Sequence, residues 1–414
     1  MAGKPHSREK KTRKLKENVI QMIPQEEAEL SEKYEGLKRR KIRIVVVRGI
    51  VISAILFGIF FAWKYYNTYH LFESYETVWS QELLEGASSS FVTFEDNVLK
   101  YTKDGVSYLN GAGTVVWNQT YEMKNPIAAV NSSYAAIADQ RGNSILICNK
   151  EGASDIITTV LPILKITVSS QGIVAVILED TTSSLIEFYT YDGRNLVDMK
   201  ASLAGSSGYP LDISLSPDGT QLMVSYIYLA NGILQNHVVF YNFSEKGKSL
   251  TDHLVGYHSS ENSTIIPKVQ FLTNESACAF GDSDLEFYSL KNELSPEKIK
   301  TKVITGEIES IFYNSHYVGI IVAGEEAAQY TLQVFDVTGN EVFKVSSDFE
   351  YRKVEFGRNT VMLWNSTECM IYNMNGVVKY SGAFDSEIVQ MDESREAWNF
   401  IIISSQEMKR IKLK

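Results

Sequence analysis

Few residues in this sequence have the types and spacing that catalysis or metal binding requires. Asp252, His253 and His258 share one short segment, but a metal site would need more ligands converging there. Residues 281–284 (GDSD) lack the other oxygen ligands and the glycine of a calcium loop, so they are expected to form a hairpin turn. Residues 205–208 (GSSG) lack the G-x-S-x-G pattern of a hydrolase nucleophile and are interpreted as a linker. We therefore expect no catalytic residues, no cofactor and no metal site.

The cysteines fit the same expectation. Cys148, Cys278 and Cys369 each fall within a predicted strand, and the three strands belong to different repeat units. Buried thiols behave as small apolar side chains, and their scatter argues against a disulfide. The sequence therefore predicts three buried free thiols.

Charge is distributed unevenly along the 414 residues, whose formal net charge is −10. Residues 1–43 carry 13 basic and 7 acidic side chains, whereas residues 70–414 carry 25 basic and 43 acidic ones. Binding to nucleic acid depends on neutralising phosphates with basic groups. An acidic main domain therefore argues against a nucleic-acid partner.

A membrane-spanning helix is predicted at residues 44–66. Its apolar part runs from Ile44 to Trp63 with Arg48 as the single charge, and at 1.5 Å per residue it spans about 30 Å. Arg48 can extend to the headgroups at one end, and Trp63 begins an aromatic belt at the other. Basic residues crowd the N-terminal side, so the positive-inside rule predicts a cytosolic N-terminus and an extracellular C-terminal domain in the cell membrane. Gly49 and Ser53 form a small-xxx-small pair, which we interpret as ordinary membrane-helix composition.

The N-terminal tail, residues 1–43, is expected to be basic, cytosolic and partly helical. Its first 18 residues are expected to be disordered, and Pro24 is expected to end a first helical stretch. The tail is interpreted either as a segment held to anionic lipid by its charges or as a docking motif for a cytosolic partner. The candidate docking side chains are apolar and adjacent: Val19, Ile20, Met22 and Ile23.

Beyond a short tether at residues 67–74, the helical period disappears and a repeat takes its place. An apolar strand is followed by Asn, Thr or Asp, then by two residues and a Gly, or an Asn in one copy, and then by another strand. The closing Gly or Asn of six copies falls at residues 113, 152, 193, 292, 339 and 376, and a looser copy lies at 238–242. Spacings of about 37–50 residues are typical of propeller blades with four antiparallel strands.

The repeats predict an all-β fold, an eight-bladed β-propeller over residues 75–414. After the seventh unit only three strands remain, and residues 75–83 are expected to supply the fourth strand of the eighth blade. Val78 and Trp79 would then pair with the last strand, which contains Ile411 and Leu413. Such pairing closes the ring and removes an open edge. Seven blades is the alternative, because residues 228–265 are irregular.

These features support a resemblance at the level of family. The Val-Trp pairs at 78–79 and 116–117 and the strand–turn–Gly units resemble eight-bladed propellers of the pyrroloquinoline-quinone-like (PQQ-like) superfamily. Residues 216–220 (SPDGT) resemble a turn of WD40-like propellers. The whole chain resembles an uncharacterised clostridial (Firmicutes) family of single-pass membrane proteins with an extracytoplasmic propeller.

The resemblance implies a non-catalytic binding or scaffold protein of the cell envelope. Its expected partners are the lipid bilayer and an envelope protein or glycan held by a propeller face. The alternative is a quinone-dependent or metal-dependent propeller enzyme or sensor. Because the carboxylate-and-metal centre of the quinone enzymes has no counterpart among these residues, their activity is not part of the expectation.

Overall fold

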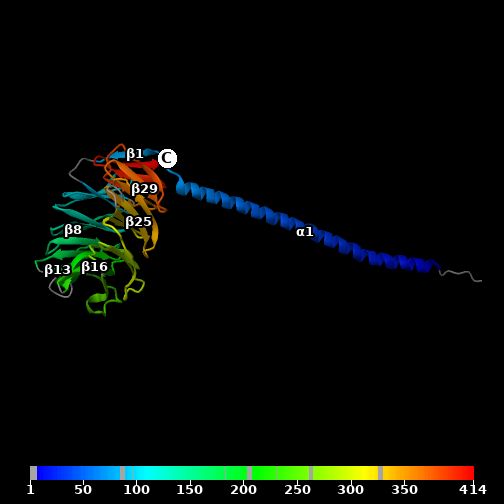
Figure 1. Cartoon of the computed structure of the whole chain (residues 1–414), viewed down its shortest axis with the longest axis horizontal. Helices are drawn as coiled ribbons and strands as arrows, with labels where there is room; N and C mark the ends of the chain where they lie inside the picture. Colours follow the sequence, from blue (N-terminus) through cyan, green and yellow to red (C-terminus); the bar gives the residue numbers. More distant parts are fainter. Residues whose placement is uncertain are drawn as a thin grey trace, which may run out of the picture. The chain divides into compact units, whose positions relative to one another are not determined.

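The computed structural model describes residues 7–83, 89–95, 97–181, 183–202, 208–230, 232–260, 264–324 and 330–414. The chain forms two compact units, which divide after His70. The first unit contains one helix, and the second contains the β-strands (Figure 1).

Helix α1 runs without interruption from Ser7 to Tyr69. Two expectations for the tail are therefore wrong: residues 7–18 are helical, and Pro24 does not end the helix. Proline removes one backbone hydrogen bond, but the residues that follow it (QEEAEL) are mostly strong helix formers, and these allow the helix to continue. The helix also extends past residue 66, so residues 67–69 belong to it and not to a tether.

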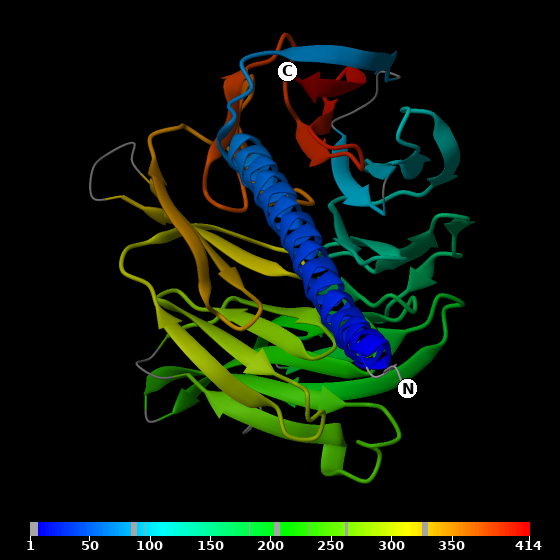
Figure 2. The ribbon, with the colours of Figure 1, turned by 90° about the vertical axis from the view of Figure 1, so that its right-hand side faces the viewer.

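The second unit is an eight-bladed β-propeller. Its strands form eight sheets of antiparallel strands, and seven of these follow sequence order from the first strand to the last (Figure 2). Most contacts between neighbouring sheets involve first strands, as between β11 and β15 and between β15 and β19, so the first strands surround the centre of the ring. The alternative of seven blades is excluded.

The first four blades lie between residues 90 and 259. Blade 1 contains β2 Ser90–Phe94, β3 Asn97–Tyr101, β4 Gly105–Leu109 and β5 Val115–Thr120. Blade 2 contains β6 Pro126–Val130, β7 Ala135–Asp139, β8 Ser144–Asn149, β9 Gly152–Ala153 and β10 Ile157–Thr158. Blade 3 contains β11 Ile163–Val168, β12 Val174–Glu179, β13 Ser183–Tyr189 and β14 Asn195–Ser202. Blade 4 contains β15 Tyr209–Leu215, β16 Gln221–Ala230, β17 Ile233–Asn242, the short 3₁₀ helix η1 Thr251–His253 and β18 Leu254–Ser259.

The other four blades use the rest of the chain. Blade 5 contains β19 Lys268–Thr273, β20 Ser276–Phe280, β21 Asp284–Ser289 and β22 Glu297–Val303. Blade 6 contains β23 Ile308–Tyr313, β24 Tyr317–Ala323, β25 Tyr330–Asp336 and β26 Glu341–Ser347. Blade 7 contains β27 Lys353–Phe356, β28 Thr360–Trp364, β29 Glu368–Asn373 and β30 Val378–Ala383. Blade 8 contains β31 Gln390–Glu393, β32 Asn399–Ile403, β33 Glu407–Leu413 and, from the other end of the domain, β1 Tyr75–Glu82.

The repeated Asn/Asp–Gly turns join the third and fourth strands of their blades, as the repeat predicts. In blade 6 the Asp336 carboxylate accepts hydrogen bonds from the backbone N–H groups of Thr338 and Asn340, both at 2.9 Å. In blade 7 the Asn373 side chain makes the corresponding bonds to Asn375 and Val377. Gly339 closes the first of these turns with φ of +79°, where a Cβ would be strained.

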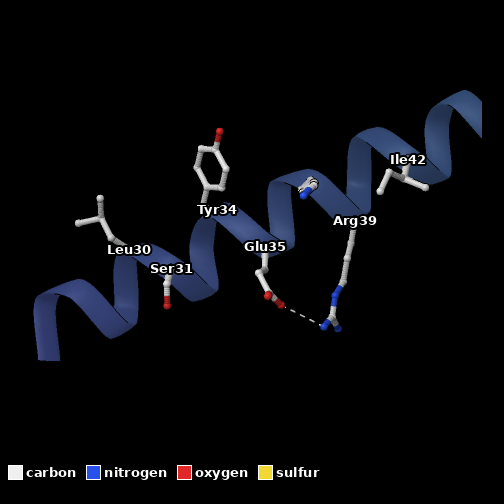
Figure 3. Close-up of a pocket in the computed structure, with 7 residues that line it drawn as sticks. Leu30, Ser31, Tyr34, Glu35, Arg39 and Ile42 are labelled. Carbon is white, nitrogen blue, oxygen red and sulfur yellow. Dashed lines mark hydrogen bonds and ion pairs between the residues drawn. The ribbon is translucent and has the colours of Figure 1, made fainter. Parts of the chain in front are cut away.

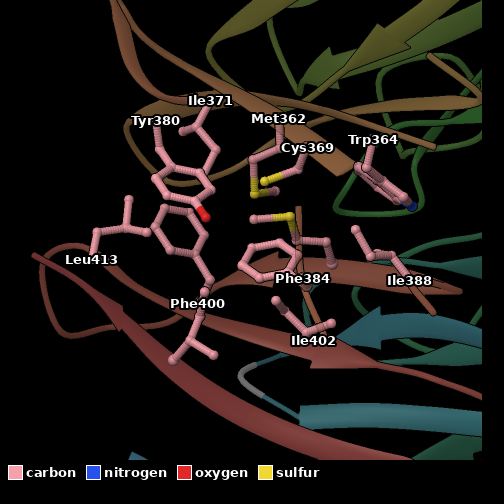
Figure 4. Close-up of a cluster of buried hydrophobic side chains, with 12 residues drawn as sticks. Met362, Trp364, Cys369, Ile371, Tyr380, Phe384, Ile388, Phe400, Ile402 and Leu413 are labelled. Carbon is pink, nitrogen blue, oxygen red and sulfur yellow. The ribbon is translucent and has the colours of Figure 1, made fainter. Parts of the chain in front are cut away.

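Apolar side chains fill the space between neighbouring blades. The cluster between blades 7 and 8 contains twelve buried residues, among them Trp364, Tyr380 and Phe400, and it also includes Ile411 and Leu413 (Figure 4). Cys148, Cys278 and Cys369 are buried and free, in β8, β20 and β29. Burial raises the pKa of the Cys148 thiol to about 12 and raises the pKa of the other two thiols as well. At neutral pH these thiols are protonated and act as apolar packing groups.

The ring closes where β1 pairs antiparallel with β33. The register places Tyr75 opposite Leu413 and Glu82 opposite Glu407, with a bulge between Thr77 and Trp79. The strand expected at residues 75–83 is thus β1, and its partner is the last strand of the chain. We call the propeller face at which β1 begins the front face. Because antiparallel strands alternate in direction, the turns between second and third strands lie on the back face.

Candidate functional site

The four residues singled out for the membrane segment, Ile44, Arg48, Gly49 and Trp63, all lie on α1. A window of this helix has a mean hydropathy of 2.6, and none of its residues is buried within the chain. The exposed fractions of Ile44 and Trp63 are 45% and 61%, and open space surrounds Gly49. A helix of this length and hydropathy suits a membrane anchor.

In the described part of the N-terminal segment, the helix surface between residues 30 and 42 offers little as a binding site. Between residues 30 and 42, Leu30 and Tyr34 point to one side of α1, and Glu35 and Arg39 form an ion pair of 3.1 Å on the opposite side (Figure 3). These side chains come from different sides of one exposed helix, so they form no enclosed cavity. The side chains of the expected docking motif, Val19, Ile20, Met22 and Ile23, lie outside the described residues.

Of the four residues expected to close the ring, three are partly or fully buried. Trp79 packs against the cluster of buried residues that contains Leu83 and Met408, and Ile411 and Leu413 are buried between blades 7 and 8. Val78 differs, because 43% of it is exposed. The bulge between Thr77 and Trp79 shifts the alternation of side chains at this point, which directs Val78 to solvent.

Polar side chains on the first strands link blades 3, 4 and 5. The Asp212 carboxylate, whose side chain is 4% exposed, lies 3.0 Å from the Lys268 ammonium and 3.8 Å from that of Lys165. It also accepts a hydrogen bond of 3.0 Å from the backbone N–H of Val269. Burial opposes the charge on Lys268, but Tyr313 and Asp212 outweigh it, so the pKa of Lys268 is raised. This network holds three blades together and leaves its charges paired.

A second polar network links blades 7 and 8. Lys353 donates to the Gln390 side chain at 3.3 Å, and Gln390 donates to the Glu355 carboxylate at 2.8 Å. Burial raises the pKa of Glu355. Burial and the nearby Glu355 raise the pKa of Asp392 to about 6. These groups connect blades, and among the described residues no three His, Cys, Asp or Glu side chains are placed to hold a metal ion.

The two motifs weighed for metal binding have other contacts. The Nε2 atom of His258 lies 3.1 Å from the Pro296 carbonyl, whereas His253 packs against Phe243 with ring centroids 5.0 Å apart. The GDSD segment forms the turn between β20 and β21, as expected for a hairpin. Asp284, the first residue of β21, is buried, and its Oδ1 atom has no hydrogen-bond partner among the described residues.

Asp284 predicts an unusual pH dependence of stability. Burial and the nearby Glu286 raise its pKa from 3.8 to about 6. Between pH 4 and 6 the folded state therefore holds a proton that the unfolded state has lost, and stability falls as the pH rises through this window. We expect Asp284→Asn to raise the melting temperature at pH 7.5 by roughly 5 °C, corresponding to about 2–3 kcal/mol. At pH 4 the gain should be much smaller.

Thermal melts at the two pH values test this, with Asp282→Asn as the matched control. Asp282 is exposed in the same turn, so its substitution should leave both melting temperatures within about 1 °C. An equal effect of Asp284→Asn at pH 4 and pH 7.5 would show that its carboxyl group does not titrate between them.

The hairpin of β16 and β17 is the surface feature that sequence reasoning missed. Each strand has ten residues, whereas the second and third strands of the other blades have five to seven. Its tip lies on the back face and exposes three aliphatic side chains: Leu229 at 66%, Ile233 at 56% and Leu234 at 51%. At its base, His237 stacks on Tyr228 at 4.1 Å and meets Tyr257 edge-on. The signal was the apolar run 226–234 inside a stretch that seemed merely irregular.

These observations define the class of protein: an eight-bladed β-propeller preceded by one apolar helix that suits a membrane anchor. Residues 68–413 match the family described as "Family of unknown function (DUF5711)", and the chain belongs to that family. The match supports the resemblance to a propeller family. No curated protein matches the chain.

One solved structure supports the fold, and others show a weaker similarity. BamB from Moraxella catarrhalis is similar with a TM-score of 0.50 and 11% identity, covering 82% of this chain and all of its own. Hsv2p from Kluyveromyces lactis has a TM-score of 0.47 and 9% identity, covering 72% of this chain and 97% of its own. A structure titled Kuenenia stuttgartiensis Hydrazine Synthase has a TM-score of 0.44 and 10% identity, covering 73% of this chain and 99% of its own. At these identities the likeness concerns the fold alone.

Proposed function

We propose that this protein is a non-catalytic scaffold of the clostridial cell envelope, anchored in the cell membrane by α1 with its N-terminus in the cytosol. The propeller then lies outside the cell, where one of its faces holds an envelope protein or glycan. The similarity of the fold to BamB, the paired charges between the blades and the basic residues before the apolar segment support this proposal.

The main observation behind the proposal is the apolar tip of the β16–β17 hairpin. Three aliphatic side chains, each more than half exposed, stand together on the back face. Exposed apolar groups of this kind often mark protein contacts, because burying them in a partner removes them from water. The tip suits a protein partner better than a glycan, which would offer more hydroxyl groups than apolar surface.

The order of the elements along the chain also supports the back face as the binding surface. Strand β1 follows the helix after only five residues and begins on the front face. The back face is at the other end of the blades, so the chain's own anchor does not start from it. A partner can therefore reach the hairpin without passing the point where the helix joins the propeller.

Site-specific photo-crosslinking in membranes tests the proposal. A photoreactive residue replacing Gln235, which is exposed beside the tip, should capture a partner from intact cells. The same residue at Thr338, in an exposed front-face turn, is the matched control and should capture much less. The triple variant Leu229→Ser, Ile233→Ser, Leu234→Ser should reduce capture at position 235 at least tenfold without changing the melting temperature by more than about 2 °C. Equal capture from both positions, or capture that survives the triple variant, would contradict the proposal.

A further inference from the structure

Residues 72–74, in the segment between the helix and β1, are bound to the propeller. The backbone N–H of Phe72 donates to the Lys379 carbonyl at 2.8 Å, and those of Glu73 and Ser74 donate to the Lys414 carbonyl at 3.1 and 3.2 Å. Lys414 returns a bond of 2.8 Å to the Ser74 carbonyl. Of the short tether predicted at residues 67–74, residues 67–69 are helical and residues 72–74 are held by blades 7 and 8.

Side chains reinforce this attachment. The ring of Phe72 lies 5.0 Å from that of Trp398, measured between centroids. The ammonium of Lys379 lies 5.5 Å from the centre of the Phe72 ring and 5.1 Å from that of Trp398, and Lys379 is fully buried. A cation close to aromatic rings in a site without water is held more strongly than at an exposed surface.

Trp398 adopts a backbone conformation that is unusual for a bulky residue. Its φ is +59°, in the left-handed region that favours glycine. The Leu413 N–H donates to its carbonyl at 3.0 Å, so the end of β33 helps to hold this conformation. Such strain persists where the surrounding contacts impose it, and it often marks a functional element.

The contacts of Tyr75, the first residue of β1, connect the segment at residues 72–74 to the closure of the ring. Tyr75 packs on Phe384 with ring centroids 4.9 Å apart, and its hydroxyl donates to the Asp385 carboxylate at 3.1 Å. The side chain of Lys409 is buried, and its ammonium also contacts the Asp385 carboxylate. Strand β1 then continues along β33, which is its single neighbour in the sheet.

We propose that residues 71–75 form a clasp through which tension on the membrane anchor controls the closure of the propeller ring. Because α1 ends at Tyr69, a pull on the helix reaches Phe72 before it reaches any paired residue of β1. Release of the Phe72 ring frees the end of β1, and β1 then separates from β33 one pair at a time. The result is an open eighth blade that exposes the hydrogen-bonding edge of β33, a surface to which another extended segment can add. This opening of the eighth blade does not depend on the identity of any partner.

Force measurements on the full chain in detergent micelles test the clasp. Handles are attached at His70→Cys and at Glu245→Cys, a highly exposed position in blade 4, and the native thiols are buried. We expect a first reversible extension of roughly 45 Å, the length of about 13 freed residues (71–83), before the rest unfolds at higher force. Phe72→Ala should lower the force of this first step at least twofold and leave the second unchanged.

Two variants in this assay separate the clasp from general weakening. Phe72→Tyr keeps the aromatic ring and should retain the force of the first step. Tyr69→Ala alters an exposed residue of α1 and should behave as the unmodified chain. A single unfolding step without early extension, or a first step that Phe72→Ala does not weaken, would overturn the proposal.

Discussion

Deleting residues 71–83 from the propeller domain should lower its melting temperature by roughly 10 °C or more, or leave it insoluble. The deletion removes the β1–β33 pairing and exposes Ile411, Leu413 and Met408, which are buried in the intact domain. Exposing several apolar side chains costs on the order of 5 kcal/mol. It also leaves an unpaired edge on β33, which favours aggregation.

A synthetic peptide of residues 71–83 provides the decisive comparison in the same melts. Added in excess to the truncated domain, it should restore most of the lost melting temperature, since binding to the folded state alone stabilises that state by mass action. A peptide of scrambled sequence is the control. Melting that is unchanged by the deletion would mean that the ring does not need β1.

Asp212→Ala should destabilise the domain by about 3–5 kcal/mol, lowering the melting temperature by roughly 6–15 °C. The substitution leaves the Lys268 ammonium, the side chain of which is 29% exposed, without its nearest carboxylate. It also leaves the buried N–H of Val269 without its acceptor. The cost is large because a partly buried charge and a buried donor both lose their compensation.

The control for this variant is Asp192→Ala, which also breaks an ion pair. The Asp192 carboxylate lies 2.7 Å from Arg194, but the two side chains are 56% and 73% exposed. Exposed pairs contribute little, so the expected loss of stability is much smaller than that of Asp212→Ala. If the two variants proved equally mild under chemical denaturation, the network around Asp212 would not be holding blades 3, 4 and 5 together.

Much of the architecture could be predicted because it repeats. Each blade needs a turn between its third and fourth strands, and such a turn favours Asp or Asn followed by Gly for local reasons. Asp336 with Gly339 and Asn373 with Gly376 therefore leave a visible period in the sequence. The incomplete last repeat and the Val-Trp pair at residues 78–79 were enough to predict an eighth blade shared by both ends of the domain.

The surfaces could not be predicted in the same way. One polar network is built from side chains of three different blades: Asp212, Lys165 and Lys268. No local sequence pattern indicates that these side chains contact one another. Val78 has the residue type of a buried position, but a bulge turns it outward. Phe72 and Trp398 are more than 300 residues apart, so their contact depends on ring closure.

By itself, the sequence determined the apolar helix, the blade period and the origin of the closing strand. These are properties of short segments, because hydropathy, strand alternation and turn chemistry act over a few neighbouring residues. Only the tertiary structure decided that helix α1 continues through Pro24, that the β16–β17 hairpin presents an apolar tip, and that residues 72–74 are bound to the propeller. The hairpin tip and the bound segment depend on which side chains and backbone groups the ring brings together across its blades, and that information is absent from any local stretch of the chain.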